Sequence, residues 1–300
     1  MTAQSKAENT PRHQPIQVLL AEGAALLRDA GVENPRREAR LLLQHALGLT
    51  PEAMLAFSAR ECVAAEPFLS WVGRRAQHEP FAYITGSKGF WSLDLSVSSA
   101  SLVPRGDTET LIGALLEQYP DHNAALSFLD LGTGTGCIVL AALAEYPEAW
   151  GIGVDINVAA ARLAQGNARR CNMVTRALMM AGQWTEALSA QARFDVVFSN
   201  PPYIPTIDLE GLMDEVRLHE PVRALDGGQD GLEAYRHLCA RLPQLLKHNG
   251  VGIFEFGIGQ EPALRDIAAQ NGLEVVQVVP DLAGIARCIV LRQGLPSTGK

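Results

Sequence analysis

Strand-like and helix-like runs alternate from Thr108 to near the end of the chain, and this alternation constrains the fold more than any other feature. The runs read, in order, SFLDL, CIVLAALAEY, WGIGVD, VAAARLAQGNARR, RALMMA, FDVVFSN, LEAYRHLCARLPQLL, VGIFEFG, EPALRDIAAQ, LEVVQVV and ARCIVL. Because short connections join them, they favour an α/β fold, with a parallel sheet and helices on both of its faces. Ligands of such sheets bind at the carboxyl ends of the strands, so functional residues are expected there.

The chain before this region has two other patterns. From Ile16 to about His78, apolar residues recur at steps of three and four without a strand signal, which predicts a small helical domain. These helices either pack together only as a stable bundle or also dock a substrate, because an amphipathic pattern is compatible with both roles. From Phe81 to Val97 the period falls to two, which predicts a β-hairpin. We therefore expect a disordered tail at residues 1–15, the helical domain at 16–78, a hairpin linker at 79–105, a catalytic domain at 106–295 and a second tail at 296–300.

Charge and cysteine content narrow the classes of function. Twenty-five Lys and Arg residues against 33 Asp and Glu residues give a net charge of −8, which offers phosphate groups no general attraction. Five cysteines without a CxxC pair indicate reduced thiols rather than a disulfide framework or a zinc site. The polar start lacks the apolar stretch of a signal peptide, and no run is long enough for a membrane span. These features predict a cytoplasmic protein with no metal, no stable nucleic-acid partner and no membrane partner.

A glycine-rich loop separates the first strand of the α/β region from the helix that follows. It reads Asp130, Leu131, Gly132, Thr133, Gly134, Thr135 and Gly136. Such a loop lets the backbone approach a ligand and points helix-terminal amides at it. At the end of the next strand, Asp155 in GVDIN can accept hydrogen bonds from both hydroxyls of a ribose. Two such signals at adjacent strand ends favour a ligand that contains adenosine.

The spacing of the glycines selects among adenosine ligands. The pattern is GxGxG rather than the GxGxxG of dinucleotide sites, and Cys137 stands where a phosphate loop needs lysine. S-adenosylmethionine, which has a ribose and no phosphate, therefore fits this loop best. Trp184, in AGQWTEAL, either lies against the adenine or fills core space.

A second rigid loop follows the fourth strand-like run. It consists of Asn200, Pro201, Pro202 and Tyr203. Two consecutive prolines stiffen the loop and remove two amide donors, so Asn200 and Tyr203 keep a fixed relation to each other. This rigidity suits a site that positions a substrate rather than one whose side chains gain or lose a proton.

These motifs resemble those of class I methyltransferases that alkylate exocyclic or amide nitrogens. Further segments are similar to the release-factor glutamine methyltransferase family, also called HemK-type, over nearly the whole chain after the tail. They are EPFAYITG at 79–86, GFWSLDLSVSSASLVPR, EPVRALDGGQDGLEAYR at 220–236, FEFGIGQ at 254–260 and DLAGIARCIV at 281–290. The resemblance implies a Rossmann-like, mostly parallel seven-stranded sheet, with the helical domain joined to it by the hairpin.

The resemblance also implies an activity and a set of site residues. The family methylates N5 of the glutamine side chain in the GGQ motif of peptide chain release factors and converts S-adenosyl-L-methionine to S-adenosyl-L-homocysteine. The implied cofactor contacts are Gly132, Thr133, Gly134, Thr135, Gly136, Asp155, Trp184 and Asn200. The implied glutamine pocket is Asn200, Pro201, Pro202 and Tyr203, of which Asn200, Pro201 and Tyr203 are the catalytic candidates.

One segment departs from the family pattern. Where the family has PRPETE, this chain has Pro104, Arg105, Gly106, Asp107, Thr108 and Glu109. Glycine in place of proline predicts a less rigid segment over the cofactor.

The residue types suggest how such a site works. An amide nitrogen is a poor nucleophile because its lone pair is delocalised into the carbonyl group. We expect the side-chain oxygen of Asn200 and the carbonyl of Pro201 to accept the two amide protons of the glutamine, while the Tyr203 ring packs on the amide plane. Positive charge grows on the nitrogen in the transition state, so these acceptors bind it more strongly there and no general base is required.

Three other functions remain as alternatives. A DNA adenine or RNA guanine methyltransferase presents a flipped base to the same NPPY geometry, but the chain has no basic target-recognition region. A non-catalytic scaffold with this fold is disfavoured by the intact glycine loop, Asp155 and NPPY. A dehydrogenase is disfavoured by the glycine spacing.

Two remaining groups of residues are predicted to be structural. Gly227, Gly228 and Gly231 are expected to shape a turn before a helix rather than to touch a ligand. His219, His237 and His248 have neither zinc spacing nor a nucleophile partner and are expected at the surface or in packing.

Overall fold

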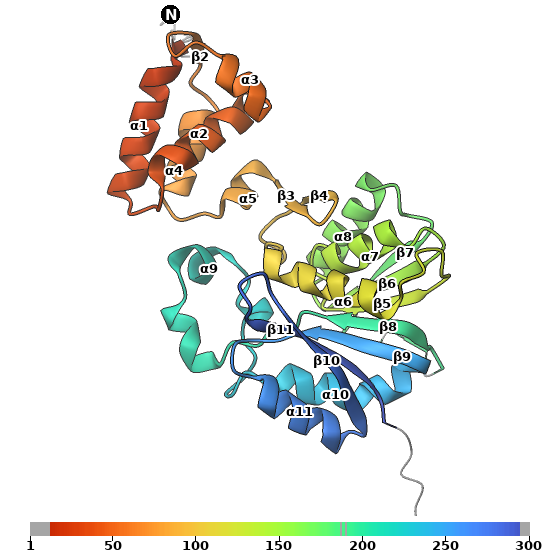
Figure 1. Cartoon of the computed structure of the whole chain (residues 1–300). Helices are drawn as coiled ribbons and strands as arrows, with labels where there is room; N and C mark the ends of the chain where they lie inside the picture. Colours follow the sequence, from red (N-terminus) through yellow and green to blue (C-terminus); the bar gives the residue numbers. More distant parts are fainter. Residues whose placement is uncertain (1–12, 187, 190, 295–300) are drawn as a thin grey trace, which may run out of the picture. The chain divides into compact units, whose positions relative to one another are not determined.

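The computed structural model describes residues 13–186, 188, 189 and 191–294 (Figure 1). These residues form two compact units. The first contains the described residues up to Thr85 together with Asp214–His219, and the second contains Gly86–Met213 and the described residues from Glu220 onward. The chain therefore leaves the second unit once, for a single short helix, and returns to it.

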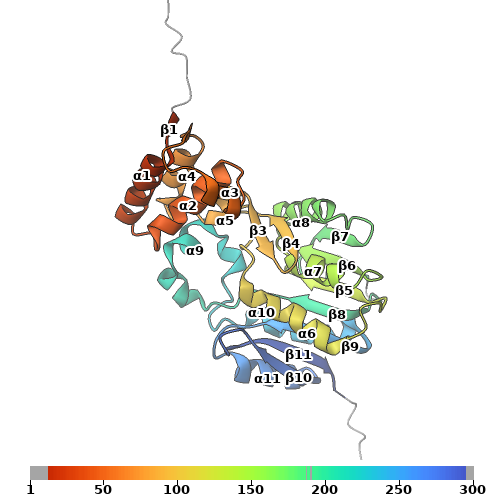
Figure 2. The same ribbon diagram turned by 45° about the horizontal axis from the view of Figure 1, so that its top comes forward.

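The first unit is built on three helices that pack around one apolar core (Figure 2). Leu19, Leu27, Leu42, Phe68 and Val72 are fully buried in this core, which accounts for the three- and four-residue spacing of the sequence. The helices are α1 (Ile16–Asp29), α2 (Pro35–Ala46) and α4 (Phe68–Arg75), and three shorter ones are α3 (Pro51–Ala56), α5 (Phe81–Thr85) and α9 (Asp214–His219).

Two predictions for this part of the chain are wrong. His13–Pro15 is not part of a disordered tail: it forms β1, which pairs antiparallel with β2 (Cys62–Ala64), inside the segment that was expected to hold no strand. Strands of three residues are too short to show a period of two, so the helical pattern on either side hides them. The remaining residues of the two predicted tails, 1–12 and 296–300, lie outside the described residues.

The hairpin is present but shorter than the alternating pattern suggested. Its strands are β3 (Ser87–Phe90) and β4 (Leu93–Ser96), and Phe81–Thr85 before them is helical rather than extended. Trp91 has a φ of 53° in the turn between the two strands. The hairpin belongs to the second unit, since the boundary between the units falls after Thr85.

The second unit is organised around a seven-stranded sheet with the order β10-β11-β9-β8-β5-β6-β7. Only β11 runs antiparallel to its neighbours, which confirms the mostly parallel sheet. The strands are β5 (Ser127–Leu131), β6 (Trp150–Asp155), β7 (Ala177–Ala181), β8 (Phe194–Ser199), β9 (Leu246–Glu255), β10 (Leu273–Pro280) and β11 (Ala286–Gln293).

Helices cover both faces of this sheet (Figure 1). Neighbouring residues of β5 show the two faces: Phe128 packs in the core beneath α6 and α7, and Leu129 packs in the core beneath α10 and α11. Burial on both sides explains why the strands read as continuous apolar runs. The helices are α6 (Thr110–Gln118), α7 (Cys137–Glu145), α8 (Val158–Arg170), α10 (Glu233–Leu245) and α11 (Glu261–Gln270), with 3₁₀ turns η1 (Gly106–Glu109), η2 (Thr206–Gly211) and η3 (Val222–Ala224). None of the helices in the described ranges combines the length and the apolar character that crossing a membrane requires.

The order of the strands reverses between β5 and β8. After β5 the chain forms β6 and β7 on one side of the sheet, and after β8 it forms β9, β10 and β11 on the other side, where β11 lies between β9 and β10. The connections after β5 and β8 therefore diverge at this point, where open α/β sheets form a crevice for ligands. The glycine loop and the NPPY segment are the two connections that start there.

Candidate functional site

A cavity of about 600 Å³ opens at the carboxyl ends of the central strands. This volume lies within the usual range of small-molecule sites. The predicted residues that line it are Gly132, Thr133, Gly134, Thr135, Asp155, Trp184, Asn200 and Pro202. Gly136, Pro201 and Tyr203 are not among the lining residues; Gly136 instead caps the start of α7 in a left-handed conformation with a φ of 82°.

The glycine loop is held by two carboxylates. The Thr133 hydroxyl donates a hydrogen bond of 2.6 Å to Oδ2 of Asp130, and the amide of Gly134 donates one of 2.9 Å to Oδ2 of Asp155. Gly132 and Gly134 have φ values of 78° and 56°, which residues with a Cβ rarely adopt. The loop is therefore held at two adjacent residues, Thr133 and Gly134, and Gly132–Thr135 lines the cavity.

Asp155 has the placement that a ribose-binding carboxylate needs. Its Oδ1 accepts a hydrogen bond of 2.8 Å from the amide of Asn157, and Oδ2 accepts the one from Gly134. Burial raises the pKa of Asp155, while these two amides act in the opposite direction. Each carboxylate oxygen keeps a second acceptor position, so Asp155 can receive two hydroxyl groups from the cavity side.

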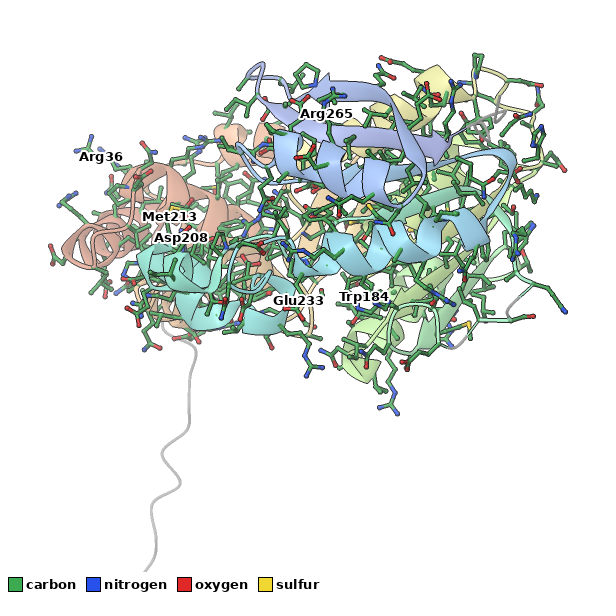
Figure 3. All side chains as sticks on the ribbon, turned by 90° about the horizontal axis from the view of Figure 1, so that it is seen from below. Arg36, Trp184, Asp208, Met213, Glu233 and Arg265 are labelled. Carbon is green, nitrogen blue, oxygen red and sulfur yellow. The ribbon has the colours of Figure 1, made fainter. Side chains whose placement is uncertain are left out.

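Trp184 lies on the cavity wall next to His237. The two ring centroids are 5.7 Å apart, with 32° between the planes, and Trp184 has a φ of 48°. Trp184 follows β7 in the chain and Glu233 is the first residue of α10; both residues, labelled in Figure 3, line the cavity. The indole also packs against the core beneath α10, so it both fills core space and offers a surface to a planar ligand. His237, expected only at the surface or in packing, is a wall residue of the cavity.

The side-chain amide of Asn200 is oriented by a residue that the sequence did not single out as a ligand contact. Its Nδ2 donates a hydrogen bond of 3.1 Å to Oγ1 of Thr108, and both residues line the cavity. Because the nitrogen has this partner, Oδ1 is the atom of Asn200 that is left for a hydrogen-bond donor in the cavity.

A buried glutamate lies behind this loop. The Tyr203 hydroxyl donates a hydrogen bond of 3.3 Å to Oε1 of Glu255, whose residue is only 2% exposed. Burial raises the pKa of Glu255 to about 7, and interactions with the hydroxyls of Thr108 and Tyr203 act to lower it. Sequence reasoning assigned no role to Thr108 or Glu255, although both lie in segments similar to the family, DTE and FEFG.

The carbonyl of Tyr203 is held as well as its hydroxyl. Gln260 Nε2 donates hydrogen bonds of 2.9 Å to the Tyr203 carbonyl and 3.2 Å to the Gly231 carbonyl. Gly227 lies so close that a Cβ there would come within 2.8 Å of the Cα atoms of Tyr203 and Gly231. Gly227 also lines the cavity, which corrects the expectation that this turn does not reach the ligand site.

The segment that carries Gly106 is anchored despite its glycine. Arg105 forms an ion pair with Glu220, and a carboxylate oxygen of Glu220 accepts a hydrogen bond of 3.2 Å from the amide of Val103. The side chain of Glu220 is fully buried, and Gly106–Glu109 closes into the 3₁₀ turn η1. The expected loss of rigidity is therefore countered by a buried carboxylate that lies far along the chain.

Comparisons with known proteins find similar sequences over most of the chain. The family model for the PrmC N-terminal domain matches residues 18–86, and that for the methyltransferase small domain matches residues 106–228. A release factor glutamine methyltransferase from Rhodospirillum rubrum is 44% identical over 92% of this chain and 84% of its own length. One from Caulobacter vibrioides is 41% identical over 88% of this chain and 91% of its own length.

Among solved structures, a methyltransferase from Pyrococcus furiosus superposes with a TM-score of 0.51 at 17% identity, covering 69% of this chain and 92% of that one. This likeness concerns the fold, and with the reversed β11 it confirms the class I methyltransferase architecture. Identity above 40% over most of both sequences, together with the two matching domain models, shows more than the fold. The chain belongs to the release factor glutamine methyltransferase family.

Proposed function

We propose that this protein transfers a methyl group from S-adenosyl-L-methionine to N5 of the glutamine in the GGQ motif of class 1 peptide chain release factors. The new N–CH₃ bond forms as the S–CH₃ bond breaks, and the products are the N5-methylglutamine side chain, S-adenosyl-L-homocysteine and one proton, which the amide nitrogen loses to water. The observation that carries the proposal is that one cavity combines the glycine loop and Asp155 with an asparagine whose nitrogen already has a partner. Relatives that bear the name release factor glutamine methyltransferase give the substrate class.

The chain has the residues to hold this cofactor. Asp155 would accept the two ribose hydroxyls, and the backbone of Gly132–Gly136 would lie along the cofactor with little steric hindrance. The indole of Trp184 would cover the adenine. When bound, the sulfonium supplies a methyl group that is already activated.

The NPPY loop would hold the substrate. Asn200 Oδ1 and the Pro201 carbonyl accept the two amide protons of the glutamine, so the nitrogen is aimed at the methyl group. Positioning of this kind supplies up to about 7 to 11 kcal/mol in favourable cases. Both acceptors gain strength as positive charge develops on the nitrogen, because they bind the transition state more tightly than the substrate. The Tyr203 ring packs on the amide plane, while its hydroxyl faces Glu255.

The remaining parts of the proposal concern partners and location. The helical domain at residues 16–78 docks the release factor, and the match of its sequence to the PrmC N-terminal domain supports this role. The net charge of −8 supports a protein substrate rather than a nucleic acid. Because the substrate acts in translation, the enzyme works in the cytoplasm.

The proposal is tested by methyl transfer from labelled S-adenosyl-L-methionine. The acceptors are a purified release factor, the same factor with the GGQ glutamine changed to alanine, and duplex DNA. We expect label on the wild-type factor alone, and fragmentation of the GGQ peptide in a mass spectrometer to place the methyl group on the glutamine. Label on DNA would indicate a nucleic-acid methyltransferase, and no label on any acceptor would indicate a scaffold.

A further inference from the structure

The side-chain amide of Gln260 joins three backbone segments beside the NPPY loop. Its Nε2 donates hydrogen bonds of 2.9 Å to the carbonyl of Tyr203 and 3.2 Å to that of Gly231. Its Oε1 accepts a hydrogen bond of 2.9 Å from the amide of Gly257. These partners belong to the end of the NPPY loop, the glycine-rich turn before α10 and the residues after β9. One amide group therefore connects loops that are far apart in the sequence.

The position of Gln260 at the start of α11 does not account for its side chain. Gln260 is the N-cap residue of this helix, where a side-chain oxygen usually accepts a hydrogen bond from one of the first helical amides. Its side chain makes no such bond, and Oε1 turns back to the amide of Gly257 instead. The side-chain amide thus holds the neighbouring loops rather than the helix to which its backbone belongs.

The NPPY loop has little internal freedom, so its attachments at the two ends determine its orientation. The proline rings fix φ at Pro201 and Pro202. A residue before a proline is confined to extended conformations, which restricts Asn200 as well. At the first end, Ser199 completes β8, and its hydroxyl donates a hydrogen bond of 2.7 Å to the carbonyl of Leu131 in β5. This end is therefore fixed to the central strands of the sheet.

The second end is the peptide group between Tyr203 and Ile204. Its N–H, on Ile204, donates a hydrogen bond of 3.0 Å to the carbonyl of Leu225. Its C=O, on Tyr203, accepts the hydrogen bond of 2.9 Å from Gln260. The plane of this peptide group is thus held at both of its polar atoms, one of them by a side chain. Loss of that side-chain amide would leave the plane free to rotate about its remaining bond.

Two glycines give the amide of Gln260 the space to reach the loop. A Cβ at Gly231 would meet the Tyr203 carbonyl oxygen and lie 2.6 Å from Nε2 of Gln260. A Cβ at Gly257 would lie 2.9 Å from Oε1 of Gln260 and 3.0 Å from the Tyr203 ring. Any larger residue at either position would therefore displace the amide, the loop or both.

We propose that Gln260 is a positioning residue for methyl transfer, whose amide fixes the peptide group after Tyr203 and so aims the NPPY loop at the substrate glutamine. This inference rests on the proposed function, because the NPPY loop is the proposed glutamine pocket. Gln260 is not among the residues that line the cavity, so it acts through the loop and not by contact with substrate or cofactor. Cofactor affinity should therefore not depend on it.

The test removes each amide or glycine contact beside a matched control. Gln260→Met keeps nearly the same length and can form none of the three hydrogen bonds. Asn271→Leu is its control, because Asn271 at the other end of α11 also donates a side-chain hydrogen bond, of 2.8 Å, to the carbonyl of Ile267. Gly231→Ala disturbs the amide from the opposite side. Its control is Gly272→Ala, at a similar φ of 69° but with no atom within 4 Å of the new Cβ.

We expect Gln260→Met to lower kcat about 10- to 100-fold, because a small misplacement of a positioning group has an effect of this size. kcat and kcat/KM for the release factor should fall by the same factor, as when an interaction made only in the transition state is lost. Cofactor affinity, measured by isothermal titration, should stay within about twofold of the wild type, as for independent sites. Asn271→Leu should keep the wild-type kcat even where urea unfolding shows the same loss of stability.

A double-mutant cycle distinguishes positioning from a general loss of stability. Gln260→Met is measured in the wild type and in the Asn200→Ala background. Residues that act through one loop are coupled, so the double variant should lose less activity than the product of the two single losses. A double variant that matches this product within about twofold would show independent effects and would overturn the inference.

The remaining outcomes separate this inference from the proposed function. A wild-type enzyme that methylates the release factor, with a Gln260→Met variant of unchanged kcat, overturns only the inference. Equal losses of kcat in Gln260→Met and Asn271→Leu overturn it as well. If Gln260→Met does not fold, the glycine pair decides: Gly231→Ala should slow transfer, and a kcat equal to that of Gly272→Ala overturns the inference. A wild-type enzyme that leaves the GGQ glutamine unlabelled overturns the proposed function and this inference with it.

Discussion

The amide of Gly134 donates a hydrogen bond of 2.9 Å to Oδ2 of Asp155, which ties the loop after β5 to the end of the neighbouring strand β6. The carboxylate that would bind the ribose therefore also fixes the shape of the glycine loop. Loss of Asp155 should lower cofactor affinity for two reasons: the hydrogen-bond acceptor for the ribose is missing, and the glycine loop loses the contact that fixes it.

Asp155→Ala should weaken S-adenosyl-L-methionine binding by about 10- to 100-fold, the effect of losing hydrogen bonds to a charged acceptor. Isothermal titration measures this change, and Asp208→Ala, at an exposed aspartate of η2, is the control that should bind as the wild type does (Figure 3). Unchanged affinity in Asp155→Ala would contradict the assignment of the ribose site.

Asn200→Ala should reduce methyl transfer by about 10²- to 10³-fold, as when one positioned group is removed from a transition state. Cofactor affinity should change little, because the proposed contact of Asn200 is to the glutamine. Single-turnover transfer and isothermal titration on the same preparation separate the two effects. A loss of cofactor binding equal to the loss of transfer would show that Asn200 serves the cofactor instead.

Gly227→Ala should slow methyl transfer because the new Cβ would lie 2.8 Å from Cα of Tyr203 and push the NPPY loop. Overpacking of this kind costs about 1–3 kcal/mol of unfolding free energy. Gly211→Ala is the matched control, since a Cβ at Gly211 meets no atom within 4 Å. Gly227→Ala should lower both the free energy of unfolding in urea and kcat. Gly211→Ala should change neither quantity.

Glu220→Ala should release the segment that carries Gly106, because it removes the partner of Arg105 and the acceptor for the Val103 amide. Hydrogen exchange of residues 103–109 should speed up by at least about tenfold, as expected when a buried charge pair is broken. The comparison is Glu274→Ala, which breaks an ion pair with Arg292 in which both side chains are about half exposed and which should have little effect. Equal exchange in the wild type and Glu220→Ala would mean that the 3₁₀ turn holds the segment by itself.

Stability should depend on pH through Asp130, which is fully buried and whose pKa burial raises to about 7. Between its unfolded value of about 4 and this value, the folded protein holds a proton that the unfolded chain has released. The free energy of unfolding contributed by this group is therefore present below about pH 4 and is lost as pH rises toward 7. Relative to the wild type, Asp130→Asn should become progressively more stable over that interval and level off above it. Urea unfolding at several pH values measures the difference, and a constant difference would show that Asp130 does not titrate there.

The sequence predicts those parts of the fold and site that depend on residues close together in the chain. The glycine loop, Asp155 and NPPY each follow one apolar run, and the end of a parallel strand is enough to place them. By contrast, Asn200 and Thr108 are 92 positions apart, and Tyr203 and Glu255 are 52 apart. No period or motif links such residues, so their contacts follow only from the assembled sheet.

The errors have the same origin. Strands β1 and β2 have three residues each and are stabilised by pairing across nearly fifty positions, which leaves no mark on the local pattern. The neighbours of Gly106 in the sequence do not indicate how rigid its segment is, because the distant Glu220 holds Arg105 and the amide of Val103.

The helix Asp214–His219 groups with the helical unit although the chain before and after it belongs to the α/β unit. The polypeptide consequently passes between the units three times, and no single cut separates them. A fragment that ends at Thr85 lacks α9 and with it Glu215, the partner of Arg75 in an ion pair of 2.9 Å. On its N-terminal side, α9 is connected through Met213 to the segment that begins at the NPPY loop. On its C-terminal side, His219 is followed directly by Glu220, which forms the ion pair with Arg105. Movement of the helical unit would therefore be transmitted through the chain on both sides of α9, which leads back to the NPPY loop in one direction and on to Glu220, the partner of Arg105, in the other.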